Sequence, residues 1–108
     1  MNARVKKRLR TYYTHFRAST YDWRDYEYHR RILFNYLGVL CKRDKELDSL
    51  YLHAGNPLRD RFDIQNPAVS NLISYIEKII EWNEADNTAV GEFREFLKDK
   101  RDKTRTRS

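Results

Sequence analysis

The apolar residues of segment 67–80 recur at intervals of three and four, which is the spacing of one face of an α-helix. The stripe comprises Val69, Leu72, Ile73, Ile76, Ile79 and Ile80. Asn66 favours the N-cap position before it, and Pro67 suits the first helical position. No segment of the chain shows the alternating pattern of a half-buried strand. The sequence therefore predicts an all-α fold with this helix at the centre of the core.

Two further stripes precede this segment. In residues 4–17 the apolar positions are Val5, Leu9, Tyr12 and Phe16. A longer helix is expected from the capping residues at 19–22 to Gly55, which can end a helix in the left-handed conformation. A break near residues 41–45 stays open, because Asp44 interrupts the stripe. Gly38 predicts either a kink or a close approach of another helix.

The C-terminal part of the chain changes character after residue 97. Thr88 is expected to cap a last helix, whose predicted inner face is Val90, Phe93, Phe96 and Leu97. Residues 98–108 contain no apolar side chain and are expected to be disordered. We predict one helical domain at 1–97, a four- or five-helix bundle with a basic N-terminal helix, and a disordered basic C-terminal tail at 98–108.

The net charge of +6 is distributed unevenly. Residues 1–17 carry six basic side chains and no acid, and residues 98–108 carry six basic and two acidic ones. The intervening residues 18–97 carry ten basic and fourteen acidic side chains, a net charge of −4. A slightly acidic body with two basic ends is typical of a protein that binds a polyanion.

On a helical wheel the charges of the first helix separate from its apolar stripe. Both resulting rows are expected to face solvent: one contains Lys6, Arg10, Tyr13 and Arg17, and the other Arg4 and Arg8. The predicted phosphate contacts are Arg4, Lys6, Lys7, Arg8, Arg10 and Arg17. We expect Tyr13 to stack on an unpaired base, and Arg30 and Arg31 to extend the surface. The alternative is a basic face that contacts only water.

Residues 21–28 contain more aromatic rings than one core stripe needs. Tyr26 fits the core stripe, whereas Tyr21 and Tyr28 fall outside it. Exposed aromatic residues often mark a protein partner. Tyr21 and Tyr28 are therefore predicted partner-binding residues, with an ordinary structural role as the alternative.

Residue types that carry catalysis or bind metals are sparse. The single cysteine, Cys41, permits no internal disulfide and indicates a reducing, cytoplasmic location. His15, His29 and His53 lack the spacing of metal ligands. Asp60 and Asp63 are expected to pair with neighbouring arginines rather than hold Mg²⁺. No apolar run is long enough to span a membrane. We predict a protein that is not an enzyme, without metal, cofactor or membrane partner.

Three short segments occur in the order found in a known family. Tyr36–Leu40, Asn56–Phe62 and the helix start Pro67–Ala68 resemble the helical C-terminal region of the large subunit of type I-C CRISPR Cascade. That region is also made separately as the small subunit of the complex. The resemblance covers residues 28–82. It implies a non-catalytic helical subunit that lines a nucleic-acid channel in a larger assembly.

A second resemblance involves a single segment. Gln65–Val69, which begins a helix, is similar to the small terminase subunits of tailed phages, DNA-recognition oligomers for genome packaging. The sequence thus predicts a non-catalytic subunit of a larger nucleoprotein complex, with a DNA or RNA backbone and other protein subunits as partners. The alternatives are a phage DNA-packaging small subunit and a protein–protein adaptor or inhibitor, such as a phage-encoded one, that acts through the aromatic residues.

Overall fold

A computed structural model describes residues 1–19, 23–60 and 65–106, and it describes only the backbone at 23–24, 56–60 and 101–106. The described chain forms five α-helices and no strand, which confirms the all-α prediction. In chain order they are α1 (Ala3–Ser19), α2 (Trp23–Cys41), α3 (Lys45–Asp60), α4 (Pro67–Ile79) and α5 (Glu84–Thr106).

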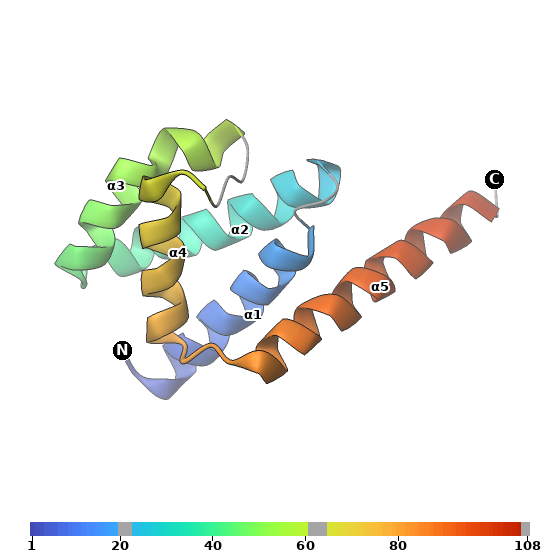
Figure 1. Cartoon of the computed structure of the whole chain (residues 1–108), viewed down its shortest axis with the longest axis horizontal. Helices are drawn as coiled ribbons and strands as arrows, with labels where there is room; N and C mark the ends of the chain where they lie inside the picture. The colour runs from blue at the N-terminus through green and yellow to red at the C-terminus, as the bar shows by residue number, and fades with distance from the viewer. Residues whose placement is uncertain (20–22, 61–64, 107–108) are drawn as a thin grey trace.

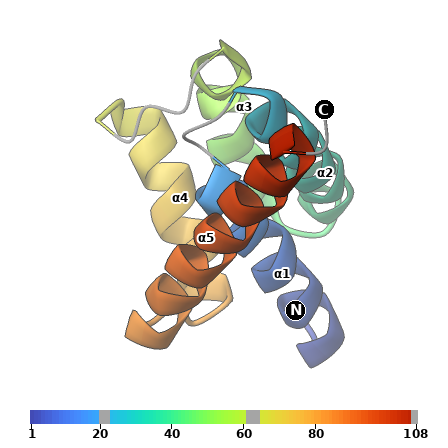
Figure 2. The same ribbon diagram turned by 90° about the vertical axis from the view of Figure 1, so that its right-hand side faces the viewer.

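The five helices pack as a bundle from which α5 projects (Figure 1). α1 packs against α2 and α5, while α3 packs against α2 and α4. Figure 2, turned by 90°, shows α5 crossing in front of α1. The longest dimension is 48 Å, against 29 and 23 Å for the other two. Since α5 extends along this axis, its C-terminal end lies far from the start of α1 (Figure 1).

The core is built mainly from α1 to α4. Its fully buried side chains include Leu9 and Phe16 of α1, Leu33 and Leu37 of α2, Leu47 of α3, and Val69, Leu72 and Ile76 of α4. Tyr26 is also buried, as its place in the stripe predicted. The expected inner face of the last helix is only partly correct, because Val90 is buried whereas Phe96 is exposed.

Local hydrogen bonds explain where the middle helices begin. The break near residues 41–45 is real: Asp44 caps α3 by accepting a hydrogen bond from the Leu47 amide at 3.0 Å. This bond, the largest influence, holds the pKa of the Asp44 carboxyl below its usual range. The Tyr75 hydroxyl also donates to Asp44 at 2.7 Å, so the cap joins α3 to α4. The Asn66 cap and Pro67 start of α4 are as predicted.

The helix stop predicted at Gly55 is wrong, and one of the two alternatives predicted for Gly38 is excluded. α3 continues through Gly55 to Asp60, and no described glycine has a positive φ. Glycine permits a left-handed stop but does not impose one, since it costs a helix interior only about 1 kcal/mol relative to alanine. A Cβ on Gly38 would meet nothing within 4 Å, so no helix makes a close approach there.

The last helix begins earlier and ends later than predicted. Asn83, not Thr88, is its cap: its side chain accepts from the Ala85 amide at 2.9 Å, and Asp86 accepts from the Asn83 amide at 3.0 Å. α5 then runs to Thr106, so the helix continues past residue 97 into the segment for which the sequence predicted disorder. Lysine and arginine have high helix propensity, so this segment extends a helix without adding to the core. Residues 107–108 lie outside the described part of the chain.

Candidate functional site

Tyr13 lies in the core, so the prediction that it faces solvent and stacks on a base is wrong. Its side chain is 0% exposed, and its ring meets Trp82 edge-on at a centroid distance of 4.9 Å. Its hydroxyl donates to the Glu77 carboxylate of α4 and accepts from Arg17 at 2.8 Å. Arg17 also donates to Glu77, at 3.2 Å. Burial, reinforced by Glu77, raises the pKa of Tyr13 well above its usual value.

Arg10 lies on the same side of α1 as Tyr13 and Arg17, and it too contacts other helices. Its guanidinium donates to the Ile80 carbonyl at the end of α4, and it lies 3.7 Å from the Asp86 carboxylate. A cation is favourable at the C-terminal end of a helix, where carbonyls lack helical partners. Arg10, Tyr13 and Arg17, which were predicted to face solvent, thus contact α4 and the start of α5, and the Arg10 side chain remains 41% exposed. Carboxylates remote in sequence neutralise these two arginines.

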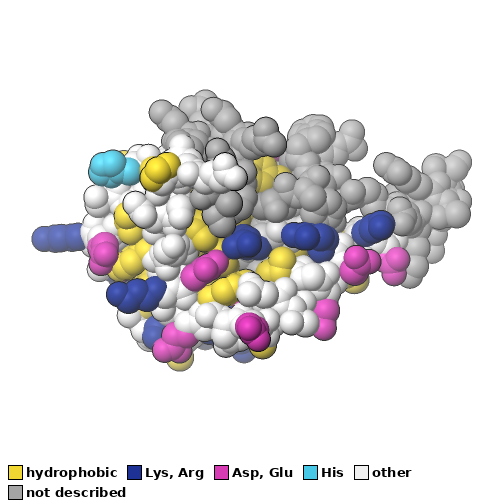
Figure 3. Space-filling view, viewed as in Figure 1, with side chains coloured by type: hydrophobic (Ala, Val, Ile, Leu, Met, Phe, Trp, Pro, Cys, Tyr) yellow, Lys and Arg dark blue, Asp and Glu magenta, His cyan; other side chains and the backbone are white. Residues whose placement is uncertain are grey.

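The other predicted row remains exposed. Arg4, Lys7 and Arg8 are all exposed on one face of α1, and we call these three residues the basic strip. Among the described residues, no carboxylate lies within ion-pair distance of any of them. Lys6 is half-buried on the opposite side of the helix. On the face shown in Figure 3, basic and acidic side chains are interspersed.

Of the two arginines expected to extend this surface, only Arg31 is exposed. Arg30 donates to Glu27 at 2.9 Å, and its guanidinium lies over the Phe34 ring at 5.8 Å. The hydrogen bond from Arg30, the main influence, lowers the pKa of Glu27. Arg30 therefore stabilises α2 locally, and the prediction that it extends the surface is wrong.

Aromatic rings follow the line where α1 meets α2. Tyr12 packs edge-on against Tyr36 at 5.4 Å, and the Arg8 guanidinium lies 5.8 Å from the centre of the Tyr36 ring. A shallow cavity of about 360 Å³ opens here, lined by Tyr12, Ile32, Asn35, Tyr36 and Val39. We call it the α1–α2 groove. The basic strip therefore has an aromatic surface directly beside it.

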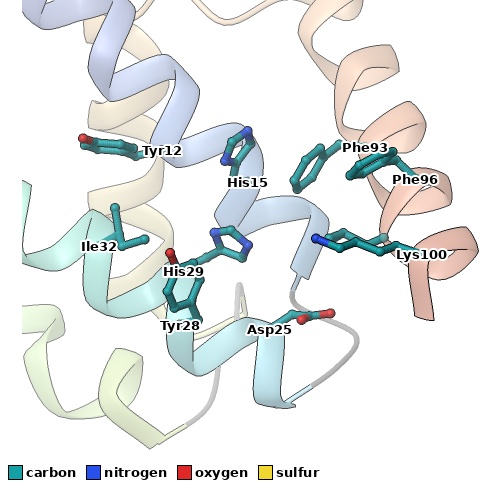
Figure 4. Close-up of a pocket in the computed structure, with 10 residues that line it drawn as sticks. Tyr12, His15, Asp25, Tyr28, His29, Ile32, Phe93, Phe96 and Lys100 are labelled. Atoms are coloured by element: carbon teal, nitrogen blue, oxygen red, sulfur yellow. The ribbon is translucent and has the colours of Figure 1, made fainter. Parts of the chain in front are cut away.

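A larger cavity, of about 550 Å³, adjoins this groove between α1, α2 and α5. We call it the aromatic pocket; its rings are Tyr12 and His15 of α1, Tyr28 and His29 of α2, and Phe93 and Phe96 of α5 (Figure 4). His15 stacks on Phe93 with centroids 4.2 Å apart and meets His29 edge-on at 5.5 Å. Asp25 and Lys100 also line the cavity. Tyr12 and Ile32 line both cavities and so connect them.

Burial sets the charge of the two histidines in this pocket. Burial is the largest influence on the pKa of each histidine, and it lowers the pKa of both His15 and His29. His15 lowers the pKa of His29 further, while Asp25 acts in the opposite direction. Both imidazoles are therefore neutral at pH 7, and each offers one hydrogen-bond donor and one acceptor.

Sequence reasoning missed this pocket, although a signal for it exists. In an antiparallel helical hairpin, residues equally distant from the turn lie opposite each other. Three residue pairs are symmetric in sequence about position 22, between α1 and α2: Arg8 and Tyr36, Tyr12 and Ile32, and His15 and His29. Pairing residues across that turn would have brought the histidines together.

The remaining candidate residues fall in less distinctive surroundings. Tyr28 is 65% exposed, as predicted for a residue outside the core stripe, whereas Tyr21 lies outside the described residues. Cys41 is half-buried, and burial raises the pKa of its thiol. The described residues contain no group of three metal-binding side chains. Within that same part of the chain, no helix combines the length and apolar character needed to cross a membrane. Asp63 lies outside the described residues, and only the backbone is described at Asp60.

No protein-family model, curated protein or solved structure matches the chain. The candidate site is therefore defined by its own geometry: the basic strip on α1, the α1–α2 groove beside it, and the aromatic pocket at the end of that groove.

Proposed function

We propose that the chain is a non-catalytic subunit of a larger assembly and binds the phosphate backbone of a nucleic acid through the basic strip. One observation carries this proposal. The bundle neutralises Arg10, Arg17 and Arg30 with its own carboxylates, whereas Arg4, Lys7 and Arg8 have no such partner among the described residues. Three cations without a carboxylate partner, placed on two adjacent turns of one helix face, suit neighbouring phosphates.

The wider charge distribution supports the same orientation. Residues 18–97 carry a net charge of −4, so a polyanion is repelled by the body and attracted to the N-terminal end of α1. Arg31, exposed on α2, adds a cation near the α1–α2 groove. The resemblance of the sequence to the small subunit of type I-C Cascade supports a role within a nucleoprotein complex. Phosphate contacts determine affinity and position, not base sequence.

The test changes the basic strip and measures the salt dependence of binding. In Arg4→Gln/Lys7→Gln/Arg8→Gln, the fluorescence anisotropy of a labelled duplex should show weaker binding between about 50 and 200 mM salt. If all three cations contact phosphate, the slope of log K against log[salt] should become shallower by about 2–3. The stability of the variant should remain unchanged, since these side chains are exposed.

A matched control removes the same charge elsewhere. Lys45→Gln/Lys78→Gln/Lys98→Gln neutralises three exposed cations, one each on α3, α4 and α5. This control should keep the wild-type slope to within about one. If both triple variants lose affinity equally, binding depends on net charge alone and the basic strip is not the site.

A second function is favoured by a separate observation. Tyr28 is 65% exposed and Phe96 58% exposed, and both line the aromatic pocket. Exposed rings that line one cavity are typical of protein interfaces, and a protein–protein adaptor or inhibitor would use them. Such a protein should bind its partner with little dependence on salt and bind nucleic acid weakly, the opposite of the result expected above.

A further inference from the structure

We propose that the aromatic pocket binds one unpaired nucleobase of a single-stranded nucleic acid whose backbone lies along the basic strip. This inference rests on the proposed function and specifies the strand type. It assigns a role to a cavity that phosphate binding alone does not use.

The first argument is position. Arg4, Arg8 and His15 are separated by four and seven residues, so they fall on one face of α1. The helical rise places His15 about 10 Å beyond Arg8 along the helix axis. A strand that contacts the basic strip and continues along α1 therefore reaches the opening of the pocket. Along the way it passes Tyr36, over whose ring Arg8 lies at 5.8 Å.

The second argument is the shape and lining of the cavity. Its volume of about 550 Å³ lies within the range typical of small-ligand sites. Rings from three helices line it (Figure 4). His15 and Phe93 are stacked on each other with centroids 4.2 Å apart, while the rings of Tyr28 and Phe96 at the same cavity remain exposed. A flat heterocycle can stack on such rings, because every base offers a π-face.

The third argument is the set of polar groups at the pocket. His15 and His29 are neutral because they are partly buried, so each presents a donor and an acceptor without a charge. Asp25 and Lys100 line the same cavity (Figure 4). The exposed edge of an unpaired base carries matching donors and acceptors.

Single strands are favoured over duplexes for a physical reason. A base in a duplex is stacked on both faces and paired at its edge, so filling the pocket would require unstacking and unpairing. An unpaired base enters without that cost, and its neighbours can stack along Tyr12 and Tyr36 in the α1–α2 groove. The arrangement combines cations along a backbone path with aromatic stacking surfaces, the two features of single-strand binding sites.

The experiment separates base binding from phosphate binding in the full chain. Fluorescence anisotropy is measured with a short labelled oligothymidylate and with an abasic strand that has the same number of phosphates. The wild type should bind the oligothymidylate about tenfold or more tightly than the abasic strand at equal salt. Tyr28→Ala/Phe96→Ala should remove most of that difference and leave abasic binding unchanged. Both side chains are exposed, so the variant should fold.

Leu52→Ala is the matched control, because Leu52 is an exposed apolar residue of α3 that lines neither cavity. It should bind both strands as the wild type does. Equal wild-type affinity for the oligothymidylate and the abasic strand would overturn the base-pocket inference while leaving backbone binding intact. Failure of both strands to bind would overturn the proposed function as well.

A second measurement distinguishes a base from a protein side chain. Adenosine monophosphate and N-acetyltryptophanamide are titrated separately while the His15 and His29 ring resonances are followed by NMR. Shifts caused by adenosine monophosphate, and lost in Tyr28→Ala/Phe96→Ala, support the inference. Shifts caused only by N-acetyltryptophanamide would show that the pocket receives an aromatic side chain of a protein, which overturns it.

Discussion

Replacing Tyr13 with phenylalanine isolates the polar contacts that join α1 to α4. The change retains the buried ring and its packing against Trp82, and it removes the hydroxyl between Arg17 and Glu77. Hydrogen bonds to charged groups contribute about 1.5–3 kcal/mol each. Arg17 and Glu77 are 27% and 30% exposed at their side chains and still pair directly at 3.2 Å, so part of this loss is recovered. We therefore expect Tyr13→Phe to lower the free energy of unfolding by about 1.5 kcal/mol, at the lower end of that range.

Urea denaturation followed by circular dichroism measures this effect. In a domain of this size, 1.5 kcal/mol corresponds to a fall of roughly 6–12 °C in Tm. Glu77→Gln should destabilise the protein too, and the double variant should lose less than the sum of the two single losses. A coupling energy of about 0.5–3 kcal/mol is expected for groups in one network.

Tyr12→Phe is the matched control, because Tyr12 has a half-buried ring one position away and no hydroxyl contact among the described residues. It should change the stability by less than about 0.5 kcal/mol. Two results would refute this reasoning: a Tyr13→Phe variant as stable as the wild type, or losses of stability in Tyr13→Phe and Glu77→Gln that simply add in the double variant. Either would show that the Tyr13–Arg17–Glu77 contacts do not stabilise the packing of α1 against α4.

Two further predictions concern stability. Ile76→Asp should unfold the domain, because Ile76 is 1% exposed at the centre of the core and the change buries an unpaired charge. Circular dichroism measures this effect. A cooperative unfolding transition in this variant would contradict the assignment of α4 to the core. Burial lowers the pKa of His15 and of His29 in the folded state. As the pH falls below about 6.5, the unperturbed histidine value, the unfolded chain therefore binds more protons than the folded chain does. The contribution of these groups to stability is complete above that pH and is lost as the pH falls through their folded values. The urea midpoint should therefore be lower at pH 5.5 than at pH 7.5, and His15→Gln/His29→Gln should reduce the difference; an equal fall in this variant would assign the pH dependence to other groups.

Local sequence determined α4 almost completely. The apolar spacing from Val69 to Ile80 requires one buried face, and the Asn66 side chain caps the helix that Pro67 begins, whatever packs around it. The sequence left the start of α3 open between two possibilities, because Asp44 can interrupt the stripe of one long helix or cap a new helix. The helix end predicted at Gly55 and the helix start predicted at Thr88 were wrong for a related reason, because each residue permits a helix end without requiring one.

The tertiary structure alone decided which side of α1 reaches solvent. The periodicity of one helix defines rows relative to each other, but both basic rows beside the Leu9–Phe16 stripe were compatible with exposure. α4 and the start of α5 bring Glu77, the Ile80 carbonyl and Asp86 against one row, so Arg10, Tyr13 and Arg17 are used internally. The basic strip is what this packing leaves uncovered. His15, His29 and Phe93 likewise meet only because three helices converge, since contacts between residues distant in sequence depend on packing that no local pattern encodes.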